Sequence, residues 1–284
     1  MINRIAVIIM FFASTLMDVY GKETRIITLG SAITETVFGL GLGGHVVATD
    51  VTSISPRAAA DLPKVSKNRS ISAEGIMAFR PTIVLVPDGD MSLAVLKHVK
   101  AAGIHVIVFK QEFTANGAYR FIQQIADALN VSDSGKEVVS RTKVTMEKIA
   151  EIIAAEGGGK KRPTVLFIYA RGTGTMSVSG KGSSLDALIR LAGGKNAVQE
   201  FAEFKPYSTE ALVSANPDVI LMFDFGLSSL GGKEAILNMP GVRLTEAGKQ
   251  QRILSMNASL LVNFSTRLPE AVLALHQALT AVTP

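Results

Sequence analysis

The chain has 284 residues, 48% of them hydrophobic, and a mean hydropathy of +0.32. That length suffices for two medium-sized domains with their own cores, and the apolar content excludes a disordered protein. The net charge of +5 is spread along the chain, so a nucleic-acid-binding surface is not indicated. The absence of cysteine excludes disulfides, thiolate metal sites and a cysteine nucleophile, and with them the lipid-anchored cysteine of bacterial lipoproteins.

The first residues have the pattern of a secretory signal peptide. Arg4 precedes the apolar run Ile5–Met17, and small residues near Gly21 suit cleavage by a signal peptidase. The apolar run is too short to cross a bilayer as a helix. We therefore expect residues 1–21 to be a cleaved signal peptide and the mature protein to be periplasmic. The alternative is an uncleaved N-terminal anchor.

The following segment alternates short strands and helices. Strands are expected over 25–29, 45–48 and 105–109, and helices over 31–40 and 93–102. Alternation at this short spacing predicts an α/β sheet.

Two stretches, one in each half of the chain, follow a single template. Ser72 and Ser208 are each followed by glutamate two residues later, proline nine later and leucine thirteen later within an apolar run. The serine suits an N-cap, and the glutamate suits the first turn of a helix, where the macrodipole favours an acid. The proline ends the helix, and the apolar run predicts a buried strand. The repeated unit indicates a two-lobed molecule.

A long helix separates the two series of elements. Apolar residues at helical spacing predict it over 134–156, a span of roughly 33 Å. Beyond it we expect strands over 164–169 and 219–223 and helices over 184–192 and 269–281. The predicted fold is α/β, with two Rossmann-like lobes (22–133 and 158–284) around central sheets, joined by a connecting helix (134–157), and a ligand cleft between the lobes. One helix is a stiffer connection than a loop.

Three loops carry the candidate ligand-binding residues. Two-lobed α/β proteins bind ligands between the lobes, near the carboxyl ends of strands and at helix N-termini. Such positions are held by Lys67, Arg69, Tyr169, Arg171 and Tyr207. Cations beside phenols favour a flat or aromatic ligand with carboxylates, because guanidinium binds carboxylate in a bidentate manner. The alternative is that these are ordinary solvated loop residues.

Motifs of enzymes are weak in this chain. Gly39, Gly41 and Gly44 fit the dinucleotide-binding pattern, but they follow a helix and precede a strand, which is the wrong order. The four histidines lack the spacing of a metal site, and we expect them at the surface or at strand edges. The three loops hold no histidine and no carboxylate pair for acid–base catalysis. We therefore expect a binding protein and not an enzyme.

A set of short motifs extends over essentially the whole mature chain: Arg25–Gly30, Thr34–Glu35, Leu62–Pro63, Ser72–Ile76, Phe79–Thr82, Leu191–Ala197, Tyr207–Leu212, Asn216–Asp218, Met239–Val242 and Thr245–Lys249. As a set they resemble the periplasmic haem-binding proteins of bacterial ABC haem importers, within the helix-linked substrate-binding class. The resemblance implies capture of haem as a transported ligand, not as a catalytic cofactor. The cargo would pass from a monomeric protein to a dimeric inner-membrane ABC permease with its ATPase. Another iron chelate (a siderophore) or a corrinoid such as cobalamin is the alternative cargo.

The resemblance also implies roles for particular residues. Glu74 and Glu210 occupy the matching positions at which family members dock on permease arginines. Family members place an iron-ligating tyrosine where this chain has Lys67, and Arg69 matches the neighbouring arginine. Several members place a histidine where this chain has Arg171. The candidates for the iron ligand are therefore Tyr207, Tyr169 and Lys67.

Overall fold

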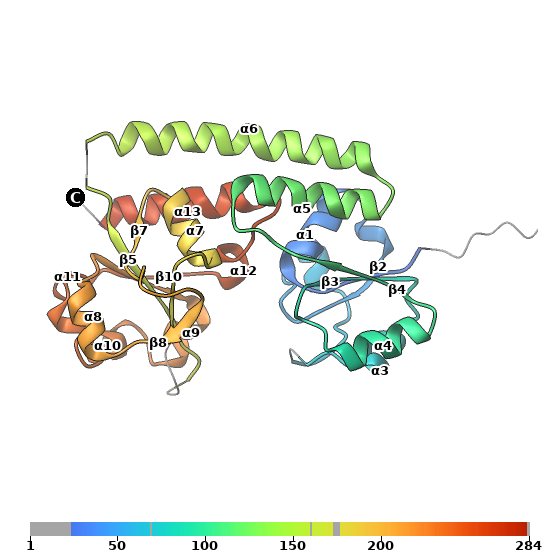
Figure 1. Ribbon diagram of the computed structural model, residues 1–284, viewed down its shortest axis with the longest axis horizontal. Coiled ribbons are helices and arrows are strands. Elements are labelled where there is room, and N and C mark those ends of the chain that lie inside the picture. The colour runs from blue at the N-terminus through green and yellow to red at the C-terminus, as the bar shows by residue number, and fades with distance from the viewer. Residues whose placement is uncertain (1–23, 69, 160, 173–176, 283–284) are drawn as a thin grey trace, which may run out of the picture.

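Two sheet-based lobes lie side by side beneath one long helix in the computed structural model, which describes residues 24–282 except 69, 160 and 173–176 (Figure 1). The expected signal peptide and Arg69 lie outside the described residues. None of the helices in the described part of the chain has the length and apolar character needed to span a membrane.

The N-terminal lobe contains a four-stranded parallel sheet in the order β2-β1-β3-β4. Its strands are β1 (Ile26–Thr28), β2 (Val46–Thr49), β3 (Ile83–Pro87) and β4 (His105–Phe109). Its helices are α1 (Ser31–Gly39), η2 (Gly43–His45), α2 (Arg57–Ala60), α3 (Ala73–Met77), α4 (Leu93–Ala101) and α5 (Ala115–Ala128).

Both faces of this sheet are covered by helices. Ile26 and Leu85 pack in the core under α1 and α5, whereas Ile27 and Val84 pack in the core under α3 and α4. Adjacent strand residues thus point to opposite faces, as the pleat requires. Burial on both sides explains why these strands are continuous apolar runs.

The C-terminal lobe has a mixed sheet in the order β10-β9-β5-β6-β8, with β7 also paired to β5. The parallel strands are β5 (Thr164–Tyr169), β7 (Lys195–Asn196), β9 (Val219–Phe223) and β10 (Ile253–Met256), and the antiparallel edge is β6 (Ser177–Ser179) and β8 (Phe204–Pro206). Its helices are α7 (Ser184–Leu191), α8 (Thr209–Ala215), α9 (Asp224–Ser229), α10 (Lys233–Leu237), η3 (Val242–Leu244), α11 (Glu246–Lys249), α12 (Ala258–Leu261) and α13 (Leu268–Val282).

The repeated template forms the same unit in both lobes. The Ser72 hydroxyl accepts a hydrogen bond from Gly75 N (3.0 Å) at the start of α3, and the Ser208 hydroxyl accepts one from Ala211 N (3.2 Å) at the start of α8. Each helix ends before the template proline, and the buried strands β3 and β9 follow. The expected N-caps and strands are therefore confirmed.

The connecting helix α6 (Ser132–Glu156) has 25 residues and crosses both lobes in Figure 1. It packs against α5 of the N-terminal lobe and α13 of the C-terminal lobe. The helix begins two residues before the expected start, and α5 was not expected from the sequence.

The lobes share part of one core. Ala118 of α5 is buried in the same apolar cluster as Phe167 of β5 and Phe264, and the rings of Phe113 and Phe264 meet edge-on with centroids 5.3 Å apart. The N-terminal lobe therefore contacts the C-terminal lobe directly as well as through α6.

Candidate functional site

A cleft of about 1260 Å³ is lined by residues of both lobes, as the sequence predicted. Its walls come from the carboxyl ends of the parallel strands: Gly30 after β1, Asp50 after β2, Asp88 after β3, Lys110 after β4, Tyr169 at the end of β5, Asp224 after β9 and Asn257 after β10. This is the position at which α/β sheets bind ligands. The volume exceeds that of most small-molecule pockets, which are about 300–1,000 Å³.

Four aromatic side chains of the C-terminal lobe form one wall of the cleft, called here the aromatic wall. Tyr169 meets Phe204, Phe223 and Phe225 edge-on, with ring centroids 6.5, 6.1 and 6.1 Å apart. Phe204 and Phe225 keep 41% and 38% of their surface exposed. Open ring faces in a cleft suit a flat, largely apolar ligand, because aromatic stacking adds to the burial of ring area.

A polar network holds the opposite wall in place. Asp50 Oδ1 accepts hydrogen bonds from Gly30 N (3.1 Å) and the Ser53 hydroxyl (2.5 Å), and Oδ2 accepts from the amide (3.2 Å) and hydroxyl (2.5 Å) of Thr52. Lys64 Nζ donates to Ser53 O at 2.9 Å. Lys64 therefore fixes the loop and is not among the described residues that line the cleft.

The charges that line the cleft are mostly negative. Of the described lining residues, Asp50, Asp88, Asp90 and Asp224 are acidic, and Lys110 is basic. An anionic group of a ligand is therefore disfavoured beside these aspartates.

The two tyrosines of the prediction lie in different surroundings. Tyr169 lines the cleft. Tyr207 is not among the lining residues: its ring packs against Phe201, and its hydroxyl donates to Glu200 Oε1 at 3.0 Å. Burial, together with the hydrogen bond to Glu200 and the charge of Glu200, raises the pKa of Tyr207 to about 12. A ligand-binding role for either residue stays a prediction.

The predicted cations lie on loops beside the cleft. Lys67 is exposed, and the next residue, Asn68, lines the cleft. Arg171 is exposed just beyond β5 and is not among the lining residues. Arg69 falls outside the described residues.

The two predicted docking residues are exposed on matching helices. Glu74 lies in the first turn of α3 and Glu210 in the first turn of α8. Figure 1 shows α3 and α8 on the side of the molecule opposite α6, one in each lobe. A hydrogen bond from its own backbone and one from the Ser208 hydroxyl lower the pKa of Glu210.

Sequence reasoning missed Phe204, Phe223 and Phe225 as site residues. The available signal was the pair of phenylalanines on either side of Asp224, directly beyond a buried strand. The other two members of the aromatic wall, Tyr169 and Phe204, come from β5 and β8. No local sequence pattern therefore indicates that the four side chains lie together.

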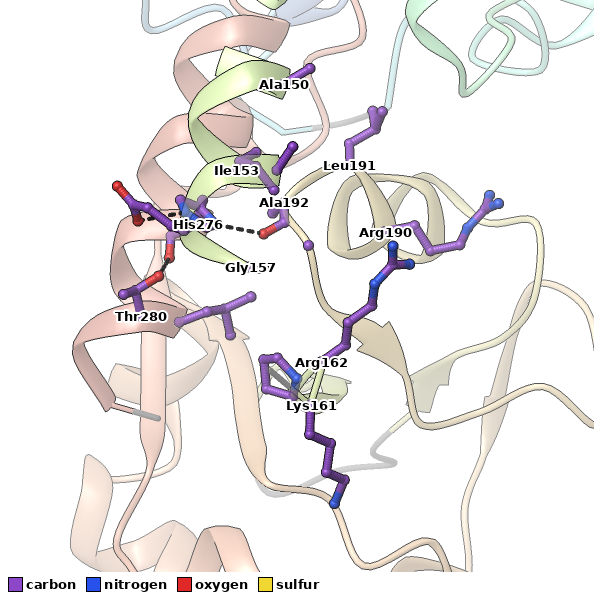
Figure 2. A pocket seen from close by; sticks show the side chains of 15 residues that line it. Ala150, Ile153, Gly157, Lys161, Arg162, Arg190, Leu191, Ala192, His276 and Thr280 are labelled. Atoms are coloured by element: carbon purple, nitrogen blue, oxygen red, sulfur yellow. Dashed lines mark hydrogen bonds and ion pairs between the residues drawn. The ribbon is translucent and has the colours of Figure 1, made fainter. Parts of the chain in front are cut away.

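A second, smaller pocket of about 360 Å³ lies where α6 ends against α7 and α13 (Figure 2). Buried His276 bridges these helices: its Nδ1 lies 3.0 Å from Ala192 O and its Nε2 lies 3.0 Å from Glu156 Oε2. The expectation that His276 lies at the surface or a strand edge is therefore wrong. Its apolar helix face turns it inward, where it anchors the end of α6.

Two α/β lobes joined by one helix and separated by a large cleft define a helix-linked binding protein. The family model described as periplasmic binding protein matches residues 26–260. The chain belongs to this family.

Related proteins, some of them with solved structures, align with this chain over most of their length. The periplasmic heme-binding protein BhuT in complex with two hemes is 37% identical, with a TM-score of 0.86 over 91% of this chain and 98% of that chain. The periplasmic heme-binding protein RhuT from Roseiflexus sp. RS-1, in apo form, is 31% identical, with a TM-score of 0.87 over 92% and 99%. A vitamin B12-binding protein of Vibrio campbellii is 23% identical over 81% of this chain and 82% of its own length.

Proposed function

We propose that this protein captures haem between its lobes and delivers it to an ABC permease. The aromatic wall carries the proposal, because haem is a flat macrocycle and the cleft offers open ring faces and a volume of about 1260 Å³. Family membership and the haem-binding relatives support it. Haem is the cargo, and the family is one of binding proteins, so no catalytic step is assigned.

Within this proposal Tyr169 is the preferred iron ligand of the three candidates. It lines the cleft at the end of β5, whereas Tyr207 is engaged with Glu200 and its pKa of about 12 opposes the phenolate that binds iron. Lys67 is exposed on a rim loop. The haem propionates are expected to turn away from the lining aspartates and toward the exposed cations Lys67 and Arg171 on the loops beside the cleft.

Titration of the mature protein with haem tests the proposal. A saturable change in the Soret absorption is expected at a stoichiometry fixed by the protein. Phe225→Ala should weaken binding of haem and of iron-free protoporphyrin alike, because ring stacking does not depend on iron. No saturable spectral change with haem would reject the assignment.

A corrinoid such as cobalamin is the second candidate, and the Vibrio campbellii relative favours it. Corrinoids are bulkier above and below the ring than haem, so they have less access to the aromatic wall. Competition between cobalamin and haem in the same titration distinguishes the two: displacement of haem by an equal concentration of cobalamin would favour the corrinoid. Another iron chelate is tested in the same way with a ferric siderophore.

The proposed partner is a dimeric inner-membrane permease with its ATPase, met by a monomeric protein in the periplasm after removal of residues 1–21. The exposed Glu74 and Glu210, one in each lobe, support docking on a two-fold symmetric surface that carries arginines.

A further inference from the structure

A buried carboxylate lies between the lobes, directly behind the wall of the cleft. Glu35 lies on α1 two residues after Ile33, and Ile33 lines the cleft. Across the interface lies the segment 263–267, which follows another lining residue, Val262. The Glu35 side chain is only 3% exposed. The two segments that form this part of the cleft wall therefore also form the contact behind it.

Glu35 uses both carboxylate oxygens to bind the other lobe. Oε2 accepts a hydrogen bond from Asn263 Nδ2 at 2.5 Å, and Oε1 accepts one from Arg267 Nη1 at 3.2 Å. Arg267 also binds both carboxylate oxygens of Glu270, at 2.6 and 2.7 Å. The adjacent Thr36 hydroxyl is hydrogen-bonded to the Ser265 hydroxyl across the same interface.

The charge of an ionised Glu35 is only partly compensated, because Arg267 makes one contact of 3.2 Å to Glu35 but two shorter contacts, of 2.6 and 2.7 Å, to Glu270. Asn263 is fully buried, and in the described part of the chain its Oδ1 has no hydrogen-bond partner. An ionised carboxylate offers no donor, whereas a neutral carboxyl group offers one O–H. A half turn of the amide lets that O–H donate to Oδ1, but Nδ2 then takes the place that Oδ1 held, so the amide alone does not decide between the two protonation states.

The burial of Glu35 favours the neutral acid over the carboxylate. Burial raises the pKa of Glu35 to about 7, because the desolvation of the carboxylate outweighs the attraction of Arg267. The negative charge of Glu270 raises the pKa of Glu35 further. Glu270 itself has its pKa lowered by the hydrogen bonds from Arg267, so it stays ionised at neutral pH.

Other charged groups on the elements around α1 are engaged elsewhere. On α5, Arg120 is paired with Glu112, and Asp127 accepts a hydrogen bond from Gln123. Burial raises the pKa of Tyr119, so this residue is neutral. His45 of η2 is exposed. Arg267 and Glu270 are therefore the charges that act on Glu35.

We propose that Glu35 is a positioning residue that links the packing of the lobes to pH: the neutral acid seals the lobe interface behind the cleft, and the carboxylate loosens it. The sign follows from linkage, since the packed interface binds the proton more tightly than a hydrated interface does. The effect on cargo release rests on the proposed function of haem capture. The effect of pH on the packing of the lobes is independent of that proposed function.

The test on ligand-free protein uses two spin labels. The chain has no cysteine, so Lys97→Cys on α4 and Lys233→Cys on α10, both exposed, place one label in each lobe. The distribution of label–label distances should be narrower at pH 6 than at pH 8.5, with a midpoint near the Glu35 pKa of about 7. Glu35→Gln should give the narrow distribution at both pH values.

Two further variants sharpen the test. Glu270→Gln removes a charge that raises the Glu35 pKa and should move the midpoint to lower pH. Glu112→Gln, an exposed acid on the N-terminal lobe, should leave the midpoint unchanged. A distance distribution that does not change with pH in the natural protein, or that still changes in Glu35→Gln, would overturn the proposal.

Haem dissociation then tests the link to cargo. At pH 8.5, haem should leave Glu35→Gln about three- to tenfold more slowly than the natural protein, the factor expected for one buried hydrogen bond. Equal rates together with pH-dependent label distances would confine the role of Glu35 to lobe packing. Absence of haem binding would reject the proposed cargo and leave the label experiment valid.

Discussion

Tyr169 and Tyr207 carry the same phenol in the same lobe, yet their surroundings give them different roles. Tyr169 lies in the aromatic wall, whereas Tyr207 donates to Glu200 and packs on Phe201. An iron ligand must lose its proton, and the pKa of about 12 for Tyr207 opposes that loss. Burial and a neighbouring carboxylate thus separate two residues that the sequence alone presents as equals.

Replacement of each tyrosine by phenylalanine tests this difference. Tyr169→Phe should shift the Soret band and raise the haem dissociation rate by about tenfold or more, because the iron loses its protein ligand. Tyr207→Phe is the matched control and should leave the spectrum unchanged. If only Tyr207→Phe changes the spectrum, Tyr207 is the iron ligand and not Tyr169. If neither substitution changes the spectrum, Lys67 is the remaining candidate.

Glu35→Gln should gain thermal stability relative to the natural protein as the pH rises. The pKa of Glu35 is raised from 4.5 to about 7 on folding, so its stabilising contribution is fully present below about 4.5 and lost as the pH rises through 7. Glutamine stays neutral throughout. Calorimetric melting temperatures of both proteins between pH 4.5 and 8 should therefore diverge in favour of the variant. A constant difference would contradict the assigned titration.

At the scale of elements, the two short helices α3 and α8 hold equivalent glutamates in equivalent positions. Each helix is fixed by its serine cap and by the strand that follows it, so Glu74 and Glu210 keep a defined geometry although both are exposed. Two such charges can engage both halves of a two-fold partner at once, and their effects combine through effective concentration.

Charge reversal at both positions tests the docking role. Glu74→Lys with Glu210→Lys should abolish transport in vesicles reconstituted with the permease and leave haem affinity unchanged. The matched control is Glu137→Lys with Glu151→Lys on α6, which makes the same change of net charge on the opposite side of the molecule (Figure 1). If transport survives the first pair of substitutions, the glutamates serve only the dipoles of their helices, worth about 0.3–1 kcal/mol each.

At the scale of the whole molecule, three contacts limit how far the lobes can move. The helix α6 packs on both lobes, α5 enters the core of the C-terminal lobe, and Glu35 binds Asn263 and Arg267. These contacts permit small changes of packing but oppose the wide closure of receptors hinged by loops.

Solution scattering measures this rigidity. The radius of gyration should be nearly the same with and without haem, because closure would require the shared core to separate. Insertion of four glycine residues after Gly157, where α6 ends, should leave this result unchanged if the direct contacts between the lobes dominate. A large decrease on binding haem to the natural protein would contradict a rigid connection.

The local elements and their order could be predicted from patterns within short stretches of the chain. The spacing of apolar residues predicted the buried strands, the serine template predicted capped helices in both lobes, and the family resemblance predicted the helix-linked fold. These features depend on residues within one or two turns of each other, so they can be recognised without knowledge of the fold. The sequence also predicted a ligand cleft and named Tyr169 among its residues.

Which loop residues face the cleft and which charge is buried depend on contacts between segments that are far apart in the chain. Glu35 and Asn263 are 228 positions apart, and the aromatic wall combines residues from β5, β8, β9 and α9. A loop residue has no periodicity that fixes its direction, so Tyr207 could not be distinguished from Tyr169 in advance. Desolvation likewise depends on what the other lobe covers, which is why the sequence of a short helix gave no sign that the pKa of its glutamate is near 7.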